Sequence, residues 1–346
     1  MTHKYKITLS VFALLLISQC SLFTDDEDQS RDVLIAYENR NNNSDSSRYD
    51  YDIWVTDFDG AGDRKLLSEI YDERSPRFDP EGSGVYFITN QNYGLRDISF
   101  ADTAGNIITQ LTAGFNVSSY DVGPGGNRLV FADNDSPISN MYLVDSDGDN
   151  LNILGPGWDP VFTDNGTAVI FLNSNGSRNI RKITFGDSDT LEITTGAPQS
   201  WIHAYSENKE RFIVWSRPGA SNNYSYYFMD NEGQFLYYLS FSAGTGVNPN
   251  LSSDGMQLVY NAYSYATNGN EIYSGNVGIA SPRQLTKAGL DAFQPAFFPD
   301  DDFVLYLQRN GNEYNLYHVD IKGKAETRVS HNMFSGYDLE YDIHVY

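Results

Sequence analysis

The chain has 346 residues, of which 40% are hydrophobic and 20% are charged. This composition excludes collagen-like, low-complexity and multi-span membrane proteins, and the length allows a core that is stable without disulfides. The 46 acidic residues outnumber the 23 basic ones and give a net charge of −23. Such a surface repels phosphate backbones, so nucleic acid is not an expected partner. Aromatic residues make up 14% of the chain, which favours β structure over helix.

The first residues have the pattern of a secretory signal. Lys4 and Lys6 precede an apolar run at 7–17, which is shorter than the about 20 residues that a membrane-spanning helix needs. The run ends at Ser18-Gln19-Cys20, and Cys20 is the only cysteine of the chain. These residues resemble the lipobox of bacterial lipoproteins, although Gln19 stands where that pattern usually has a small residue. The resemblance implies that Cys20 carries a lipid, and a plain signal peptide with an incidental cysteine is the alternative.

A polar segment follows Cys20. It runs to residue 31, contains four successive acidic residues at 25–28 and lacks apolar periodicity, so we expect a solvated tether. The expected organisation is a signal peptide over 1–19, an acidic tether over 20–31 and a folded domain over 32–346. The protein would then be exported and held by its lipid in the bacterial cell envelope.

A turn of the form Asp-x-x-Gly recurs along the folded domain. Its five copies begin at Asp57, Asp102, Asp145, Asp230 and Asp320, at intervals of 45, 43, 85 and 90 residues. These intervals are one or two periods of about 43–45 residues, and the two missing copies fall at 186–189 and 275–278. Self-similarity at such a period indicates a repeat architecture.

Four repeats begin with an opening marker, which Pro76-Arg77-Phe78 and the segment 295–297 exemplify, and the segments 120–122 and 203–205 occupy the equivalent place in two others. After a turn, an apolar run follows, as at 85–88 and 304–307. Continuous β-branched and aromatic runs of this length predict strands that are buried on both faces. A third strand, and a fourth that ends in Leu-Thr as at 111–112 and 285–286, complete a unit of four strands.

Four short strands in every 40–50 residues are the plan of a β-propeller. The segment Ser-Pro-Arg-Phe-Asp-Pro-Glu-Gly at 75–82, with the Asp-x-x-Gly turn and the Leu-Thr ending, resembles the TolB-like (PD40) propeller repeat over essentially all of 33–346. We expect an all-β fold of seven four-stranded blades, with six blades, the usual number for TolB, as the alternative. The first unit lacks its opening strand and a surplus strand lies near 337–341. That strand is expected to close the ring, because an open ring would leave two unpaired edges.

One copy of the turn has the alternating carboxylates Asp145, Asp147 and Asp149, which suit a calcium ion. Its sixth position is Asn150, where a calcium loop has glycine, and its twelfth is Pro156, where such a loop has glutamate. The other units have a plain hairpin turn at the same place, so local hydrogen bonds and a positive φ explain the residues better. Calcium is the less favoured interpretation.

Catalytic motifs are few. After the signal the chain has four histidines, none of them paired at metal-ligand spacing, and it has no Gly-x-Ser-x-Gly elbow and no glycine-rich phosphate loop before a helix pattern. We therefore expect neither a cofactor nor an enzyme activity. The alternative is a propeller enzyme, a lyase or hydrolase, acting on extracytoplasmic polysaccharide or peptide. Its mark would be histidines and carboxylates that converge around a metal in the central channel.

The opening strands of propeller blades line the central channel, so the polar residues beside the opening marker are the candidates for partner binding. They are Arg74, Arg77, Asp121, Asp159, His203, Asn248, Asn250 and Gln294. The arginines either pair with Asp121 and Asp159 in a structural network, which we favour, or attract a carboxylate of the partner.

A second candidate surface is the Ser/Asn-rich loop that holds Tyr263 and Tyr265. Exposed tyrosines suit carbohydrate or peptide recognition. The chain is therefore expected to be a monomeric, non-enzymatic, lipid-anchored propeller. Its channel mouth and loops would bind a protein or a glycan of the envelope.

Overall fold

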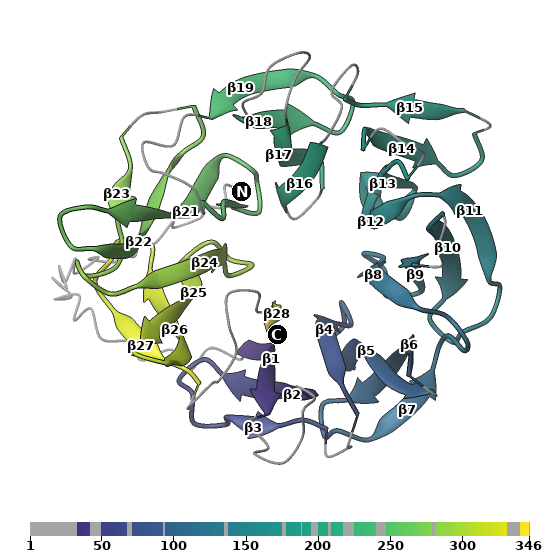
Figure 1. Cartoon of the computed structure of the whole chain (residues 1–346), viewed down its shortest axis with the longest axis horizontal. Helices are drawn as coiled ribbons and strands as arrows, with labels where there is room; N and C mark the ends of the chain where they lie inside the picture. The colour runs from purple at the N-terminus through teal and green to yellow at the C-terminus, as the bar shows by residue number, and fades with distance from the viewer. Residues whose placement is uncertain are drawn as a thin grey trace, which may run out of the picture. The chain divides into compact units, whose positions relative to one another are not determined.

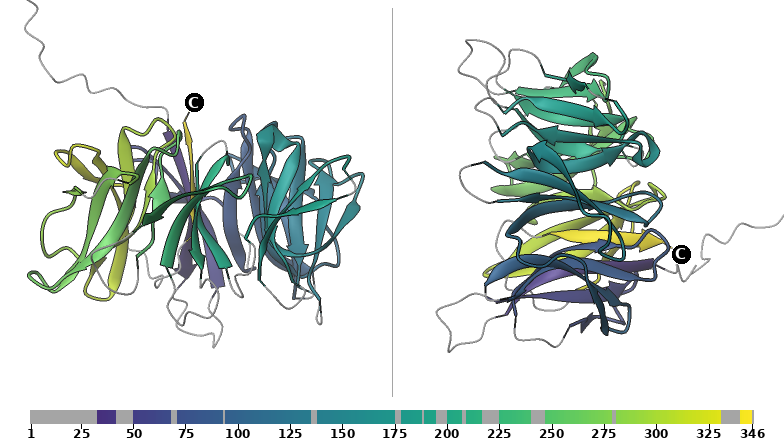
Figure 2. Two further views of the ribbon diagram at one scale, coloured as in Figure 1. Left: turned by 90° about the horizontal axis from the view of Figure 1, so that it is seen from above. Right: turned by 90° about the vertical axis from the view of Figure 1, so that its right-hand side faces the viewer.

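The computed structural model describes residues 33–41, 50–67, 71–92, 94–134, 138–174, 178–187, 189–194, 200–206, 209–216, 225–239, 247–278, 281–330 and 340–345. They belong to one compact unit, Asp32–Tyr346. Its strands form seven four-stranded antiparallel sheets in a ring (Figure 1). From the side, the strands cross the thickness of a flat disc (Figure 2). The predicted signal, Cys20 and the tether lie outside the described residues, and no described helix is long and apolar enough to cross a membrane.

The blades follow one another in chain order, and the first strand of each lies next to the central channel (Figure 1). Blade 1 contains β28 (Tyr341–Val345), β1 (Val33–Asn41), β2 (Asp50–Asp57) and β3 (Arg64–Lys65). Blade 2 contains β4 (Glu73–Phe78), β5 (Gly84–Asn92), β6 (Leu95–Asp102) and β7 (Ile107–Gln110). Blade 3 contains β8 (Val117–Val122), β9 (Arg128–Asp133), β10 (Asn140–Asp145) and β11 (Asn152–Pro156).

Blade 4 contains β12 (Trp158–Thr163), the 3-10 helix η1 (Asp164–Gly166), β13 (Ala168–Leu172), β14 (Ile180–Thr184) and β15 (Thr190–Glu192). Blade 5 contains β16 (Ser200–Tyr205), β17 (Arg211–Ser216), β18 (Ser225–Asp230) and β19 (Phe235–Leu239). Blade 6 contains β20 (Asn250–Leu251), β21 (Gln257–Ser264), β22 (Gly269–Asn276) and β23 (Arg283–Gln284). Blade 7 contains β24 (Ala292–Phe297), β25 (Phe303–Asn310), β26 (Glu313–Asp320) and β27 (Glu326–Arg328).

The C-terminal strand closes the ring, as the sequence predicted. In Figure 1, β28 lies beside β1, and the two pair antiparallel from Val33↔Val345 to Tyr37↔Tyr341. The strand lies at 341–345, so its predicted position near 337–341 was wrong by four residues. Packing explains the register, because Ile343 packs against the apolar cluster that contains Ile35.

The core is divided among the seven wedges between neighbouring blades. Each wedge contains an apolar cluster built from the inner strands of both neighbours. The predicted runs supply most of the buried side chains: in β9, Leu129, Val130 and Phe131 are fully buried. Since burying one such side chain contributes about 1.5–3 kcal/mol, blade-to-blade packing is the main source of stability.

The two repeated sequence markers interlock between blades. The turn glycine has a positive φ and packs against the residue that follows the fourth strand of the preceding blade, which is the leucine of the Leu-Thr ending in two of the five copies; a Cβ on Gly60, for example, would lie 2.8 Å from the Cα of Val329. The contacts pair Gly105 with Leu66, Gly148 with Leu111, Gly233 with Ile193 and Gly323 with Leu285. The threonine hydroxyl accepts a hydrogen bond from the third strand, as Thr112 Oγ1 does from the Ile98 N–H at 2.9 Å. The markers therefore recur together because they touch.

Candidate functional site

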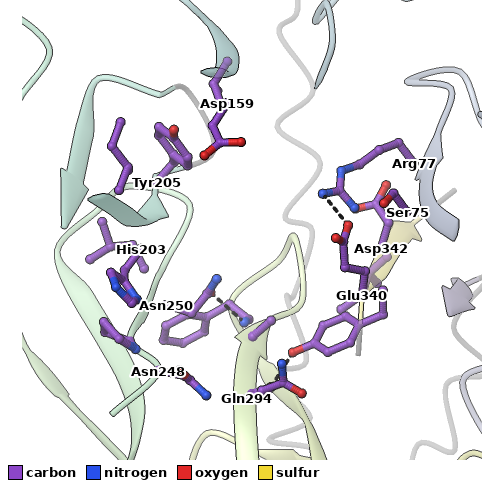
Figure 3. Close-up of a pocket in the computed structure, with 18 of the residues that line it drawn as sticks. Ser75, Arg77, Asp159, His203, Tyr205, Asn248, Asn250, Gln294, Glu340 and Asp342 are labelled. Carbon is purple, nitrogen blue, oxygen red and sulfur yellow. Dashed lines mark hydrogen bonds and ion pairs between the residues drawn. The ribbon is translucent and has the colours of Figure 1, made fainter. Parts of the chain in front are cut away.

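A cavity of about 830 Å³ lies in the central channel. Most of its lining comes from the opening strands of all seven blades, and Leu172 of β13 and residues after β20 and β24 add to it. Six predicted residues are among the side chains that line it, namely Arg77, Asp159, His203, Asn248, Asn250 and Gln294 (Figure 3). Arg74, Asp121, Tyr263 and Tyr265 are not part of this lining.

A backbone irregularity directs several of these side chains. Ser75, Asp159 and Gln294 have φ values of 55°, 47° and 48°, and each lies in a register shift of its opening strand. A β-bulge of this kind inserts a residue without a cross-strand partner and re-aims its side chain. Non-glycine residues with positive φ cost about 1–3 kcal/mol and cluster at ligand sites. We call these three residues the channel position.

On the opening strands of three other blades, side chains of similar kinds hold neighbouring blades together. Carboxylate or amide oxygens accept the backbone N–H of the next opening strand, and we call these residues the clasp position. The bonds are Asp121 Oδ2 from Phe162 (2.9 Å), Asn250 Oδ1 from Phe297 (3.1 Å) and Asp342 Oδ2 from Phe78 (2.8 Å). Asp121 and Asn250 therefore connect blades, whatever else they contact.

Arg77 belongs to a structural network. Its Nη2 lies 3.4 Å from Oε2 of Glu340, and its Nη1 donates to the Pro76 carbonyl at 2.8 Å. Burial disfavours the guanidinium, but Glu340 and Asp342 offset this and raise the pKa of Arg77. The expected pairing of the arginines with Asp121 and Asp159 is therefore corrected for Arg77, whose main partners are Glu340 and Asp342.

Arg74 points to a different environment. Its Nε lies 3.1 Å from a carboxylate oxygen of Asp72, and its guanidinium lies 3.9 Å from the centre of the Tyr51 ring. Both contacts are within blades 1 and 2 or their connection. The sequence grouped Arg74 with Arg77, but the bulge between them separates their side chains.

Asp159 projects into the channel. Figure 3 shows its carboxylate across the cavity from Arg77, Glu340 and Asp342. Burial raises the pKa of Asp159, and the negative charge of Glu340 adds to that shift, whereas the Ser119 hydroxyl beside it and Arg178 lower it. Asp159 is thus a carboxylate that faces the cavity without a close cationic partner among the described residues.

His203 is the histidine of the cavity lining. Its ring lies 5.4 Å from the Tyr226 ring and 6.0 Å from the Trp215 ring, both edge-on. Burial lowers the pKa of His203, so the imidazole is neutral near pH 7. A neutral imidazole offers one hydrogen-bond donor and one acceptor to the channel.

Tyr263 and Tyr265 form a separate surface, and Tyr263 lies in β21, paired with Asn270, where the sequence predicted a loop. Tyr265 is 88% exposed, and its ring lies edge-on to that of Tyr263 at 5.1 Å. The Tyr263 hydroxyl donates to Oδ1 of Asn268 at 2.6 Å. The channel and this tyrosine pair are therefore two distinct candidate binding sites.

The carboxylates considered for calcium close a hairpin instead. Asp145 Oδ2 accepts from Nδ2 of Asn150 at 2.7 Å, and Asp147 Oδ1 accepts from the Asp149 N–H at 2.9 Å. Gly148 has a φ of 89° in the same turn. Across the described residues, no three His, Cys, Asp or Glu side chains are grouped so as to hold a metal ion.

Several lining residues were missed by the sequence reasoning. Glu340 and Asp342 escaped because the candidates were taken from residues beside the opening markers, and the closing strand has no such marker. Ser75 was available as the residue before Pro76, in the same relation as Asp159 to Pro160. Tyr120 lines the cavity too, and its hydroxyl donates to the Ser75 carbonyl at 2.5 Å.

The architecture is shared with solved structures of low sequence identity. TolB from Acinetobacter baumannii is 18% identical, with a TM-score of 0.53 over 90% of this chain and 67% of that one. The resemblance to TolB-like propellers is confirmed for the fold. The propeller domain of the trilobed protease of Pyrococcus furiosus (13% identity, TM-score 0.64) covers 86% of this chain and 94% of that one. That domain is described as having an open velcro topology, whereas β28 closes the ring here.

An oligogalacturonate lyase in complex with manganese is also similar, with 13% identity and a TM-score of 0.61 over 78% of this chain and 82% of that one. No family model and no curated protein matches the sequence. At these identities the similarities establish the propeller fold alone.

Proposed function

We propose that this protein is a non-enzymatic binding propeller of the bacterial envelope, whose channel receives a segment of a protein or glycan partner. The observation that carries the proposal is the convergence of six polar residues, predicted from sequence, on one cavity of about 830 Å³. Ligand sites are typically concave, with a few polar groups that converge on the bound molecule.

The composition of the channel supports binding over catalysis. Amides from Asn248 and Gln294 and one histidine, His203, accompany the carboxylates of the lining. Scattered amides and carboxylates are what we expect of a binding channel, whereas an enzyme would have histidines and carboxylates that converge around a metal. The donor set in the described residues offers no cluster of metal ligands. Binding of manganese in the channel of this protein would contradict the proposal and favour an enzyme similar to the lyase.

The envelope location rests on the N-terminal sequence, and TolB proteins among the similar structures agree with it. We propose that Cys20 carries the anchoring lipid. Replacing Cys20 by Ser should abolish the incorporation of labelled fatty acid and release the protein from membranes. Equal labelling of both forms would contradict the anchor while leaving the binding proposal open to its own test.

The binding proposal is tested by capture of partners from envelope extracts. The double variant His203→Ala with Asn248→Ala removes two polar groups of the channel and spares the clasp position. It should lose capture while its melting temperature stays within a few degrees of wild type. The matched control is Tyr263→Ala with Tyr265→Ala. Loss of capture in that control, with capture intact in the channel variant, would move the site to the outer loop.

A further inference from the structure

The charged groups of the cavity lining are not balanced. Among the described residues, the lining contains one arginine, Arg77, and four carboxylates, those of Asp159, Asp301, Glu340 and Asp342. With neutral His203, the formal charge of the lining is therefore about −3. A cavity of one charge sign attracts ligands of the opposite sign, because its protein walls focus the electric field.

Three of the four carboxylates already have hydrogen-bond or ion-pair partners within the protein. Asp301 accepts the N–H of Ser253 at 2.8 Å and its hydroxyl at 2.5 Å. Asp342 accepts the Phe78 N–H, and Glu340 pairs with Arg77. Asp159 differs because it faces the cavity from a bulge, with Ser119 beside it and Arg178 acting only at longer range. A ligand cation would therefore find its partner at Asp159.

The aromatic rings of the wall are occupied by the protein itself. Trp201 lies 5.2 Å from the Trp215 ring, and the Arg178 guanidinium lies 5.3 Å from the Trp201 centroid. The Tyr341 hydroxyl donates to the carbonyl of Gln294. These contacts leave little open aromatic face for a sugar ring to stack on.

The amide side chains of the wall suit a polypeptide. Asn248 and Gln294 line the cavity on blades 6 and 7, and Figure 3 shows them on the same side as His203. A carboxamide carries both donors and acceptors, which match the N–H and C=O groups of a peptide backbone. Amides for a backbone and a carboxylate for a side chain together favour a peptide with a basic residue.

We propose that the channel binds a polypeptide segment through a lysine ammonium or arginine guanidinium that pairs with Asp159. This proposal rests on the binding function proposed above and names the chemistry of the partner. From the sequence we considered that the arginines attract a carboxylate of the partner. The structure favours a cationic partner group instead, because Arg77 pairs with Glu340 and a partner's carboxylate would meet a negative cavity.

The test uses the mature chain with Cys20→Ser, which keeps it in solution, and three sets of bead-bound heptapeptides. The sets have the same randomised uncharged flanks and blocked ends, and their central residue is Lys, Gln or Glu. A charge-assisted hydrogen bond predicts about tenfold stronger capture by the Lys set than by the Gln set. Asp159→Asn should reduce this ratio to near one, because asparagine tolerates positive φ and keeps the shape.

The matched control is Asp187→Asn, which removes an exposed carboxylate in the turn after β14 and changes the net charge equally. It should keep the preference for lysine. A preference that survives in Asp159→Asn would overturn the proposal, as would equal capture of the Lys and Gln sets. If those sets are captured equally by wild type and lost by the His203→Ala, Asn248→Ala variant, the channel function stands and the cationic chemistry fails. Binding of chitosan oligomers but not the Lys set would likewise overturn the choice of polypeptide.

Discussion

Polar side chains on the opening strands of different blades have two uses. At the clasp position, Asp121, Asn250 and Asp342 accept backbone hydrogen bonds from the next blade. At the channel position, Asp159 and Gln294 face the cavity from a bulge. The residue types are alike, so the polarity of a side chain does not decide its role. The place of the residue on its strand decides it, because Asp159 and Gln294 lie within a bulge, whereas the clasp residues lie where their oxygens reach the next opening strand.

Removing the closing strand should have the largest effect, because it deletes both an entire strand of blade 1 and a clasp. A chain that ends at residue 339 loses the pairing of β28 with β1 and the clasp of Asp342 on Phe78. We expect a loss of several kcal/mol from a total of about 5–15 kcal/mol, seen as aggregation or a much lower melting temperature. An unchanged melting temperature would mean that β28 does not stabilise the ring.

Glu38 supports the channel position from blade 1, and it should make stability depend on pH. Its side chain is 3% exposed, and its Oε1 accepts the Ser75 N–H at 2.5 Å. Burial and the nearby Glu340 raise the pKa of Glu38 from 4.5 to about 7. The protonated form is favoured in the fold, so the stability it contributes below pH 4.5 is lost as the pH rises through 7. The expected loss is about 3 kcal/mol.

Urea unfolding at pH 4.5 and pH 8 measures this contribution. Glu38→Gln keeps the acceptor for the Ser75 N–H and removes the titration, so the variant should lose about 3 kcal/mol less than wild type over that interval. Asp187→Asn serves as the control and should behave as wild type. Parallel pH dependence of wild type and Glu38→Gln would show that Glu38 ionises normally in the fold.

Removing a single clasp hydrogen bond should lower the free energy of unfolding by less than removing β28 or ionising Glu38. Asp121→Ala leaves the N–H of Phe162, a residue that is 2% exposed, without its acceptor, and should cost about 1–3 kcal/mol of unfolding free energy. Asp121→Asn retains an acceptor and should recover most of that loss. If Asp121→Ala unfolds at the same urea concentration as wild type, the clasp position does not hold the blades together.

The smallest effect is expected at the channel position, and it should have the opposite sign. Asp159→Gly removes the carboxylate and relieves a φ of 47°, so we expect a gain of up to about 1 kcal/mol. Differential scanning calorimetry would show a melting temperature equal to or slightly above wild type. A clear loss of stability would place Asp159 among the residues that hold the fold.

The same comparison explains which features of the fold and the channel could be predicted from the sequence. Seven blades and ring closure followed from the Asp-x-x-Gly turns and apolar runs, because these are local patterns that contact one another in every wedge. The interlocking of Gly148 with Leu111 is one such contact. Six of the eight residues proposed for the channel line it, because an opening strand is recognised by its marker.

What could not be predicted depends on contacts between distant segments. The partners of Arg77 come from residues 340 and 342, whose register is set by packing of Ile343 and not by a local pattern. The separation of Arg74 from Arg77 depends on a bulge that leaves no distinct mark in the sequence. Asp121 and Asp159 look alike as residues beside a marker, and only the neighbouring blade shows that Asp121 is a clasp.

The central claim is that the partner occupies the channel, and blocking the channel tests it most directly. In a chain with Cys20→Ser, a single cysteine is introduced by His203→Cys and labelled with a bulky polyethylene glycol maleimide. The same label on Tyr265→Cys provides the control on the exposed outer loop. The account predicts that the label at position 203 abolishes capture of the envelope partner and that the label at position 265 leaves it intact. Capture that survives the label at 203 and is lost with the label at 265 would contradict it.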